Sequence, residues 1–279
     1  DVYKRQHPAT AANVATLNER GAVLVGPEEG HLASGLVAVG RMSEPARLLG
    51  EVRLLLSRQN GPLAGRKIVV TAGGTREAID PVRYLTNRSS GKQGYALAQA
   101  ALDAGAEVTL VSSAVGVAPP TGATVIAVDS AQEMADAVLA AVRDADVLLM
   151  AAAVADFRPA QVSQQKIKKE GGAPVIELTP NPDILQLVWK QREAEGSPQV
   201  VVGFAAETQD LLANAGGKLT RKGLDLIVAN NVSQADAGFA VDTNRVTLLR
   251  ADAEPEILPL MGKNAVAEEI VGRVELLLA

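Results

Sequence analysis

The stretch KIVVTAGGT, residues 67–75, joins a short apolar strand to a pair of glycines. Four residues in succession that favour strands, Ile68 to Thr71, predict a buried strand, and the glycines end it. A helical pattern follows from Gly94 to Ala104, and a second apolar run extends from Glu107 to Ser112. Because a helix that connects two such strands is typical of a βαβ unit, we expect these two strands to be parallel.

The same alternation of strands and helices continues to the end of the chain. Short apolar runs separated by amphipathic helices predict a doubly wound α/β fold, with a mainly parallel, Rossmann-like sheet and helices on both faces. The further expected strands are Thr124 to Val128, Val147 to Ala152, Val175 to Leu178, Val200 to Phe204, Leu226 to Ala229 and Arg245 to Leu249. The further expected helices are Ala131 to Arg143, Asp183 to Arg192, Gln209 to Gly223 and Lys263 to Leu278.

The N-terminal part has a different rhythm. We expect a helix from Ala11 to Arg20, a strand from Ala22 to Gly26, a glycine-rich loop from Pro27 to Gly40 and a helix from Pro45 to Arg58. These pieces are too few to enclose a core of their own. The linker-like stretch NGPLAG at 60–65 suggests two domains, residues 1–59 and 60–279, and an N-terminus that begins with Asp1 suggests truncation.

The composition excludes several functional classes. The 279 residues include no Cys, which excludes disulfides and thiol chemistry, and only two His, which cannot form a multi-histidine metal site. A net charge of −5 argues against nucleic-acid binding. No apolar run is long enough for a membrane span, and no signal peptide is evident. We therefore expect a cytoplasmic protein that acts on small molecules.

Ligands of a doubly wound fold bind beyond the carboxyl ends of its strands. The turn with Gly73, Gly74 and Thr75 is a candidate phosphate loop, although an ordinary strand-to-helix turn explains it equally well. Arg83 and Asn87 lie four residues apart before a helix, where their donors would suit a carboxylate or a mixed anhydride. The alternative for this second segment is a solvated loop.

Other candidates follow later strands. Small residues at Ala151 to Ala153 would let a flat ring rest on the backbone, and Asp156 could accept hydrogen bonds from an amine or hydroxyl, although a lone Asp there is usually a cap. Two basic clusters, the KIKK run that begins at Lys166 and a helical set, fit a triphosphate, although such runs are usually solvated surface. The helical set is Lys218, Arg221 and Lys222. The pattern of Asn181, Pro182, Asp183 and Ile184 is typical of a simple helix cap, and Phe204 fits either core or base platform.

These motifs, in this order, resemble the phosphopantothenate–cysteine ligase domain of the bacterial bifunctional coenzyme A biosynthesis flavoproteins, the Dfp or CoaBC family. The resemblance rests on TAGGTREAIDPVRYLTNRSSGKQG, AAVADFRP, KIKK, NPDI, GFAAET and KLTRKGLDLIVAN, and it covers about residues 65–279. The segments HPATAANVATLNERG and GPEEGHLASGLVAVGRMSEP resemble the last part of the fused, flavodoxin-like decarboxylase domain.

The resemblance implies a two-step reaction in coenzyme A biosynthesis. The carboxylate of 4′-phosphopantothenate would attack CTP to give an acyl-cytidylate and pyrophosphate, and L-cysteine would then displace CMP. Mg²⁺ is the expected companion of the triphosphate, with unknown protein ligands. The family ligase is a dimer, which implies a homodimer here.

The resemblance also implies roles for single residues. Lys166 would support formation of the acyl-cytidylate, Asn87 would hold that intermediate for the second step, and Arg83 would assist. The implied nucleotide-binding residues are Gly73, Gly74, Thr75, Ala151, Ala152, Ala153, Asp156, Asn181, Pro182, Asp183, Ile184, Phe204, Lys218 and Lys222.

The decarboxylase resemblance departs from the family pattern at one position. The family has a Cys-Gly pair before the GRM segment, whereas this chain has Ser34-Gly35, and a Ser hydroxyl is a far weaker acid than a thiol. The family's flavin-binding segments lie outside the resemblance, so FMN is expected only for the missing part of that domain. We expect no decarboxylation by this chain.

Two other functional classes compete with the ligase. A non-catalytic nucleotide-binding or regulatory subunit would lack catalytic residues, whereas Asn87, Arg83, Lys166 and Lys218 are all present. A Rossmann oxidoreductase would need a dinucleotide fingerprint and an acidic residue at the end of its second strand, where this chain has Ser112-Ser113.

Overall fold

The computed structural model describes residues 2–169, 174–207, 210–231, 241–251 and 253–279. The chain divides into two compact units, one that ends at Leu55 and one from Leu56 to Ala279, and each is described separately. The expected boundary between residues 59 and 60 rests on linker composition and stays a prediction.

The second unit is built on an eight-stranded sheet with the order β15-β14-β12-β11-β8-β3-β6-β7. The strands are β3 (Lys67–Ala72), β6 (Glu107–Ser112), β7 (Thr124–Ala127), β8 (Val147–Met150), β11 (Val200–Glu207), β12 (Leu226–Asn231), β14 (Val246–Leu249) and β15 (Glu256–Ile257). The six strands from β12 to β7 are parallel, whereas β14 and β15 pair antiparallel at one edge. The winding direction reverses between β3 and β8, which is where such sheets bind ligands.

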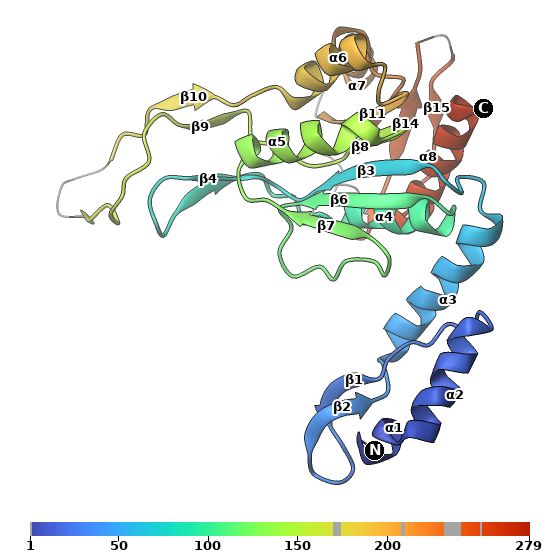
Figure 1. Ribbon diagram of the computed structural model, residues 1–279. Helices are drawn as coiled ribbons and strands as arrows, with labels where there is room; N and C mark the ends of the chain where they lie inside the picture. Colours follow the sequence, from blue (N-terminus) through green and yellow to red (C-terminus); the bar gives the residue numbers. More distant parts are fainter. Residues whose placement is uncertain (1, 170–173, 208–209, 232–240, 252) are drawn as a thin grey trace. The chain divides into compact units, whose positions relative to one another are not determined.

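Helices cover both faces of this sheet (Figure 1). Helices α4 (Lys92–Asp103) and α8 (Lys263–Leu278) pack together on one face. Helices α5 (Ala131–Ala141), α6 (Ile184–Glu195) and α7 (Leu211–Arg221) lie on the other, and a short 3₁₀ turn, Val142–Asp144, follows α5. The doubly wound, mainly parallel fold expected from the sequence is confirmed.

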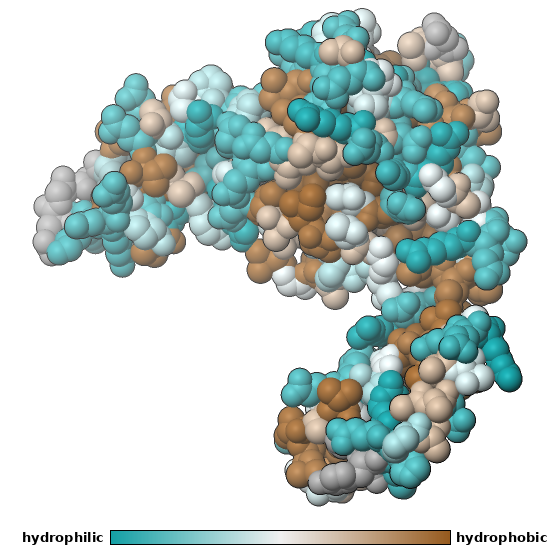
Figure 2. All heavy atoms as spheres, in the orientation of Figure 1, coloured by the Kyte–Doolittle hydropathy of each residue, from teal (hydrophilic) through white to brown (hydrophobic). Residues whose placement is uncertain are grey.

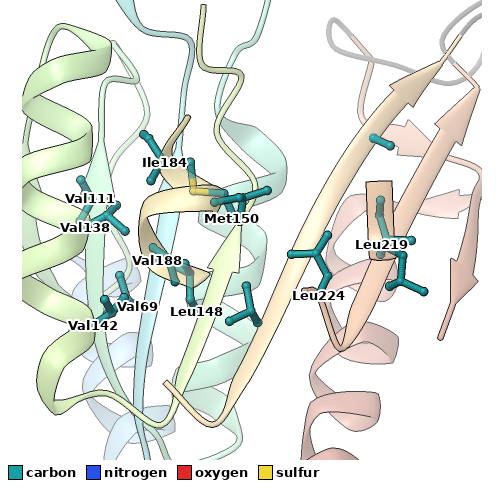
Figure 3. Close-up of a cluster of buried hydrophobic side chains, with 14 of the residues drawn as sticks. Val69, Val111, Val138, Val142, Leu148, Met150, Ile184, Val188, Leu219 and Leu224 are labelled. Carbon is teal, nitrogen blue, oxygen red and sulfur yellow. The ribbon is translucent and has the colours of Figure 1, made fainter. Parts of the chain in front are cut away.

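A cluster of buried aliphatic side chains joins the sheet to the second helical layer. Figure 3 shows Leu148 of β8 beside Val188 of α6, and Val111 of β6 beside Val138 of α5. Leu148, Val138 and Val188 are fully buried. Each such side chain stabilises the fold by about 1.5–3 kcal/mol relative to an exposed one, so this layer anchors β8 firmly below the ligand-binding edge.

Two hairpins extend from the sheet and form what we call the arm (Figure 1). The arm consists of β4 (Arg76–Ala78), β5 (Tyr84–Thr86), the turn 79–83 between them, β9 (Phe157–Pro159), β10 (Leu178–Pro180) and residues 163–167. The pairs β4–β5 and β9–β10 are antiparallel, and the Ser163 amide donates to the Ile79 carbonyl at 3.0 Å. The sequence analysis missed these short strands, and the strand expected from Val175 to Leu178 is wrong, because β10 begins at Leu178 and pairs outside the main sheet.

The start of α6 also differs from the expected cap. The N-cap is Asp183, whose carboxylate accepts from the Gln186 amide at 3.1 Å, so Asn181 and Pro182 precede the helix. Asn181 instead donates its side-chain amide to the Ala155 carbonyl at 2.8 Å. The residues Asn181–Ile184 therefore contain the start of α6 and also contact, through Asn181, the loop that follows β8.

The first unit contains α1 (Val2–Gln6), α2 (Pro8–Glu19), the hairpin β1 (Glu28–His31) and β2 (Val37–Arg41), and the start of α3 (Pro45–Asn60). The expected strand from Ala22 to Gly26 and the loop from Pro27 to Gly40 are both wrong. A turn with Gly35 at φ +82° reverses the chain, and its neighbours pair as a hairpin. Figure 2 shows hydrophobic residues at the surface of this hairpin. In the part of the chain that the structure describes, no helix has both the length and the apolar composition of a membrane span.

Helix α4 is seated on β3 through a glycine, which gives a stability test. A Cβ at Gly94 would lie 2.5 Å from Cβ of Ala72 and 2.7 Å from the Thr71 carbonyl oxygen. We expect Gly94→Ala to lower the free energy of unfolding by about 1–3 kcal/mol in a urea titration. Gly272→Ala in α8, where a Cβ meets open space, is the matched control and should raise stability by about 0.5–1 kcal/mol. Equal effects of the two substitutions would contradict this packing.

Candidate functional site

A pocket of about 900 Å³ opens at the carboxyl ends of β8 and β11, beside the start of α4. Most of the predicted nucleotide-binding residues, and the predicted catalytic residue Asn87, line this pocket. They are Asn87, Ala151, Ala152, Ala153, Asp156, Asn181, Pro182, Asp183, Ile184, Phe204, Lys218 and Lys222. They come from five separate segments of the chain. Residues at the carboxyl ends of neighbouring strands therefore share one crevice, as the fold class predicts.

The segment Ala151–Asp156, which follows β8, forms one wall of the pocket. Asn87 donates its side-chain amide to the carbonyls of Ala153 and Val154, at 3.1 and 3.2 Å. From the other side, the Asn181 amide group donates to the Ala155 carbonyl. Asn87 thus holds this wall in place through its hydrogen bonds and also lines the pocket.

The cationic residues of α7 meet the ends of β11 and α6. Lys218 Nζ donates to the Phe204 carbonyl oxygen at 2.6 Å, and Lys222 pairs with the Asp183 carboxylate. The pocket lining includes six cationic residues, Arg88, Lys92, Lys218, Arg221, Lys222 and Lys263, and two carboxylates, those of Asp156 and Asp183. The excess of positive charge suits a polyanionic ligand, because fixed cations offset the repulsion between its charged groups.

The first turn of α4 is a part of the lining that motif analysis left unassigned. Gly91 is the N-cap of this helix, in the left-handed conformation at φ +79°, and as a glycine it has no side chain to cap the helix. The amides of a helix start and the helix dipole both favour a negatively charged group. The signal in the sequence is the run Ser89-Ser90-Gly91, three small residues directly before the helix.

Two further side chains in the lining have unused acceptors. Gln93 Oε1 and Asn230 Oδ1 are buried and have no hydrogen-bond partner among the described residues. A buried acceptor without a donor is costly, so a ligand with hydroxyl or amine groups would satisfy them. A sequence offers no direct signal for such atoms, since their burial is decided by packing.

The glycine turn does not line the pocket. Gly73, Gly74 and Thr75 are buried behind the wall. Gly74 forms a parallel bridge with Ala153, and the Thr75 hydroxyl accepts from the Ala155 amide at 2.9 Å. The turn thus supports residues 151–155 from behind, whereas a phosphate loop needs amides that are open to a ligand.

Two of the three predicted catalytic residues lie in the arm, outside the pocket lining. Arg83 donates to the Asp80 carboxylate at 3.0 Å through Nε and to the Ile167 carbonyl at 2.9 Å. The Ile167 amide donates to the same Asp80 carboxylate at 3.1 Å, which places the neighbouring Lys166 near Arg83. Asp80 is thus the buried residue that joins the two hairpins, and the motif analysis did not assign it.

The described residues contain no cluster of three or more His, Asp or Glu that could hold a metal ion. A divalent ion at this site would depend on the ligand for most of its oxygen donors. Asp156 is exposed in the pocket lining, whereas Asp183 is engaged with Lys222 and with the start of α6. This donor set fits Mg²⁺, which commonly binds substrate phosphates with one or two carboxylates and water.

Asp80 provides a test of how the arm is held. Hydrogen bonds from Arg83 and from backbone amides hold the pKa of this carboxyl well below its usual range. The stabilisation that the Asp80 carboxylate gives to the arm is therefore complete above the pKa of an unfolded Asp, about 3.9. It is lost only as the pH falls through the lower pKa of Asp80 in the folded chain. We expect protection of the Arg83 and Ile167 amides from hydrogen exchange to be independent of pH between about 5 and 8, after correction for intrinsic exchange rates.

Asp80→Asn should reduce that protection by about tenfold, because a neutral amide binds Arg83 more weakly than a carboxylate does. Asp136→Asn, on the exposed side of α5, is the matched control and should change nothing in the arm. Unchanged protection in Asp80→Asn would mean that other contacts hold the two hairpins together.

Comparison with known proteins identifies relatives of the whole chain. Residues 63–277 match the family model described as "DNA/pantothenate metabolism flavoprotein C-terminal domain". The coenzyme A biosynthesis bifunctional protein CoaBC of Mycobacterium bovis is 48% identical over 98% of this chain and 68% of its own length. The protein of the same name from Bacillus subtilis is 43% identical over 98% of this chain and 67% of its own length.

A solved structure gives the same result. The crystal structure of the C-terminal domain of a coenzyme A biosynthesis bifunctional protein CoaBC superposes with a TM-score of 0.67 at 41% identity. The match covers 78% of this chain and 98% of that one. By its sequence, its fold and the extent of these matches, the chain belongs to the family of DNA/pantothenate metabolism flavoprotein C-terminal domains.

Proposed function

We propose that this chain, an enzyme of the phosphopantothenate–cysteine ligase type, joins 4′-phosphopantothenate to L-cysteine with CTP as the activating nucleotide. The observation that carries the proposal is the convergence of five chain segments on one cationic pocket, with family-matched residues in its lining. A ligase of this kind must bring two anions together, and the excess of cations in the pocket offsets their repulsion.

The proposed reaction has two balanced steps. A carboxylate oxygen of 4′-phosphopantothenate attacks the α-phosphorus of CTP, the bond to the β-phosphate breaks, and pyrophosphate leaves with the electron pair. The cysteine amine then attacks the acyl carbon, the bond to the cytidylate oxygen breaks, and CMP and a proton are released. Neither step needs a covalent bond to the enzyme, so positioning and charge stabilisation supply the catalysis.

The pocket lining suggests how CTP is oriented. Lys218 and Lys222, one helical turn apart at the end of α7, would bind the phosphates together with the first turn of α4. The base would rest near Ala152 and Ala153, where small side chains leave the backbone accessible, and Phe204 would lie beside it. Mg²⁺, when bound, would neutralise phosphate charge, and Asp156, an exposed carboxylate of the lining, would be its candidate protein ligand.

The arm supports the expected homodimer. Arg83 and Lys166 lie outside the pocket lining of their own chain, and the arm carries exposed apolar side chains, with Val82 60% and Phe157 53% exposed. Exposed apolar surface of this kind is typical of protein interfaces. We propose that the ligase domains pair and that the second copy completes the substrate pocket.

The remaining expectations from the sequence stay predictions. They are the cytoplasmic location, the absence of nucleic-acid partners and the absence of decarboxylation. Ser34, which stands where the family has a Cys, lies in the exposed turn between β1 and β2.

The choice of nucleotide is tested by competition. The chain should release pyrophosphate when 4′-phosphopantothenate and CTP are both present, and ATP, GTP or UTP should support the release at least about tenfold less well. A coupled pyrophosphate assay with each nucleotide, and then with pairs of nucleotides, measures the preference. Omission of 4′-phosphopantothenate is the control, since a protein that merely binds nucleotide releases no pyrophosphate. A preference for ATP would overturn the choice of CTP.

Asn87→Asp tests the second step. Its carboxylate would face the carbonyl oxygens of Ala153 and Val154 and would repel the phosphate of the intermediate. We expect the first step to proceed and amide formation to slow by about 100-fold, so that acyl-cytidylate accumulates. Quenched-flow measurement with radiolabelled CTP detects the intermediate. Normal turnover would remove Asn87 from the mechanism.

Lys166→Gln provides the contrasting variant. We expect it to abolish formation of the acyl-cytidylate, because an uncharged side chain cannot offset charge on the phosphates. The same quenched-flow experiment should then show no intermediate at any CTP concentration. If saturating CTP restores the wild-type rate, Lys166 serves only in binding.

A further inference from the structure

The support behind residues 151–155 consists largely of two buried threonine hydroxyls. After the last ladder pair of β3 and β8, Thr71 with Met150, the regular pairing of the two strands ends, and Gly74 and Ala153 form an isolated bridge further along. Thr71 Oγ1 accepts from the Ala152 amide at 3.0 Å, and Thr75 Oγ1 accepts from the Ala155 amide at 2.9 Å. Both threonines are 0% exposed, so their hydroxyls cannot bind a ligand directly.

Thr75 is held in place on several sides. Its own amide donates to the Ala153 carbonyl at 3.3 Å. Before it, Gly73 adopts φ +93°, and a Cβ there would lie 2.5 Å from the Ala114 amide nitrogen. After it, the Arg76 amide donates to the Asp129 carbonyl, and the buried Glu77 carboxylate accepts from the amide at the start of α5. These contacts fix the position of the Thr75 hydroxyl, which in turn holds the Ala155 amide of the wall.

This arrangement decides which backbone groups of the wall remain available. The amides of Ala152, Ala153 and Ala155 all donate to β3 or to the turn that follows it. Within the described residues, the Ala152 carbonyl and the Val154 amide have no hydrogen-bond partner, and both residues line the pocket. The wall thus offers an acceptor and a donor two residues apart, beside the Ala151 carbonyl and the Asp156 amide, which also have no partner among the described residues.

An acceptor beside a donor complements one class of nucleobase. Cytosine presents an exocyclic amine, which donates, next to a ring nitrogen, which accepts. Uracil presents a carbonyl and a ring N–H at the same positions, so both of its groups would meet a like partner. Because a buried polar group without its partner is costly, a fixed acceptor–donor pair discriminates between the two bases.

We propose that Thr75 is a positioning residue for nucleotide selection: its hydroxyl holds the Ala155 amide and thereby fixes the neighbouring Val154 amide in the orientation that reads the base. This inference rests on the proposed function, because it concerns the same pocket and the same nucleotide. It assigns to Thr75 an indirect role in place of the direct nucleotide contact expected from the sequence.

The test is a change in selectivity rather than in activity alone. Thr75→Val keeps the shape of the side chain and removes the acceptor, so the Ala155 amide loses its partner and the wall relaxes. We expect the ratio of kcat/KM for CTP to that for UTP to fall by about tenfold, while pyrophosphate release with CTP persists. Thr75→Ser keeps the hydroxyl and should retain the wild-type ratio. If Thr75→Val does not fold, Thr75→Ala carries the same expectation.

Thr247→Val is the matched control. Thr247 is also a buried threonine, 7% exposed, but it lies in β14 and outside the pocket lining. The substitution should leave the ratio of CTP to UTP unchanged. A ratio in Thr75→Val within about twofold of wild type, or an equal fall in Thr247→Val, would overturn the inference.

The outcome for Thr75 is separable from the outcome for the proposed function. If the wild-type chain prefers ATP, the choice of CTP is wrong, and the ratio of ATP to GTP then decides the inference, since these purines differ in the same amine and carbonyl. If no nucleotide supports pyrophosphate release, calorimetric binding of CTP and UTP to the wild-type and variant chains decides it. Equal relative affinities in the two chains, or binding of neither nucleotide to either chain, would overturn it.

Discussion

The parting of β3 and β8 is the constraint on which the functional site depends. Two parallel strands that separate at their carboxyl ends leave backbone amides without ladder partners, and such amides cannot stay unpaired in a buried position. Here the hydroxyls of Thr71 and Thr75 and the Gly74–Ala153 bridge supply the missing partners. The wall of the pocket is therefore tied to the sheet beneath it, although it belongs to no regular strand.

Charge is arranged around this wall on separate elements. The basic residues of α7 and the first turn of α4 line the same pocket. In the arm, the Asp80 carboxylate binds both Arg83 and the Ile167 amide. The cationic pocket and the arm are thus two distinct groups of residues within one unit. In a homodimer, the arm of one copy would complete the pocket of the other copy.

Much of the fold could be predicted because its strands and helices carry strong local patterns. The apolar run at Ile68–Thr71 defines β3, and the expected bounds of α8, Lys263 to Leu278, agree with the structure. The failures are short elements such as β4, β9 and the β1–β2 hairpin, whose strands have three to five residues. So few residues carry too little periodicity to identify a strand, because such strands exist only through the partner that pairs with them.

The sequence by itself determined the family, the alternation of strands and helices, and the residue types of the pocket. These depend on local patterns and on motifs that follow one another in the same order as in the family. Only the tertiary structure decided which of those residues meet. It brought Lys218 and Lys222 to Phe204 and Asp183, and it placed Thr75 behind the wall instead of in the pocket. Hydrogen bonds between residues about 80 positions apart, such as those from the wall to Thr71 and Thr75, leave no trace in a local pattern, because they form only once β3 and β8 lie side by side in the folded chain.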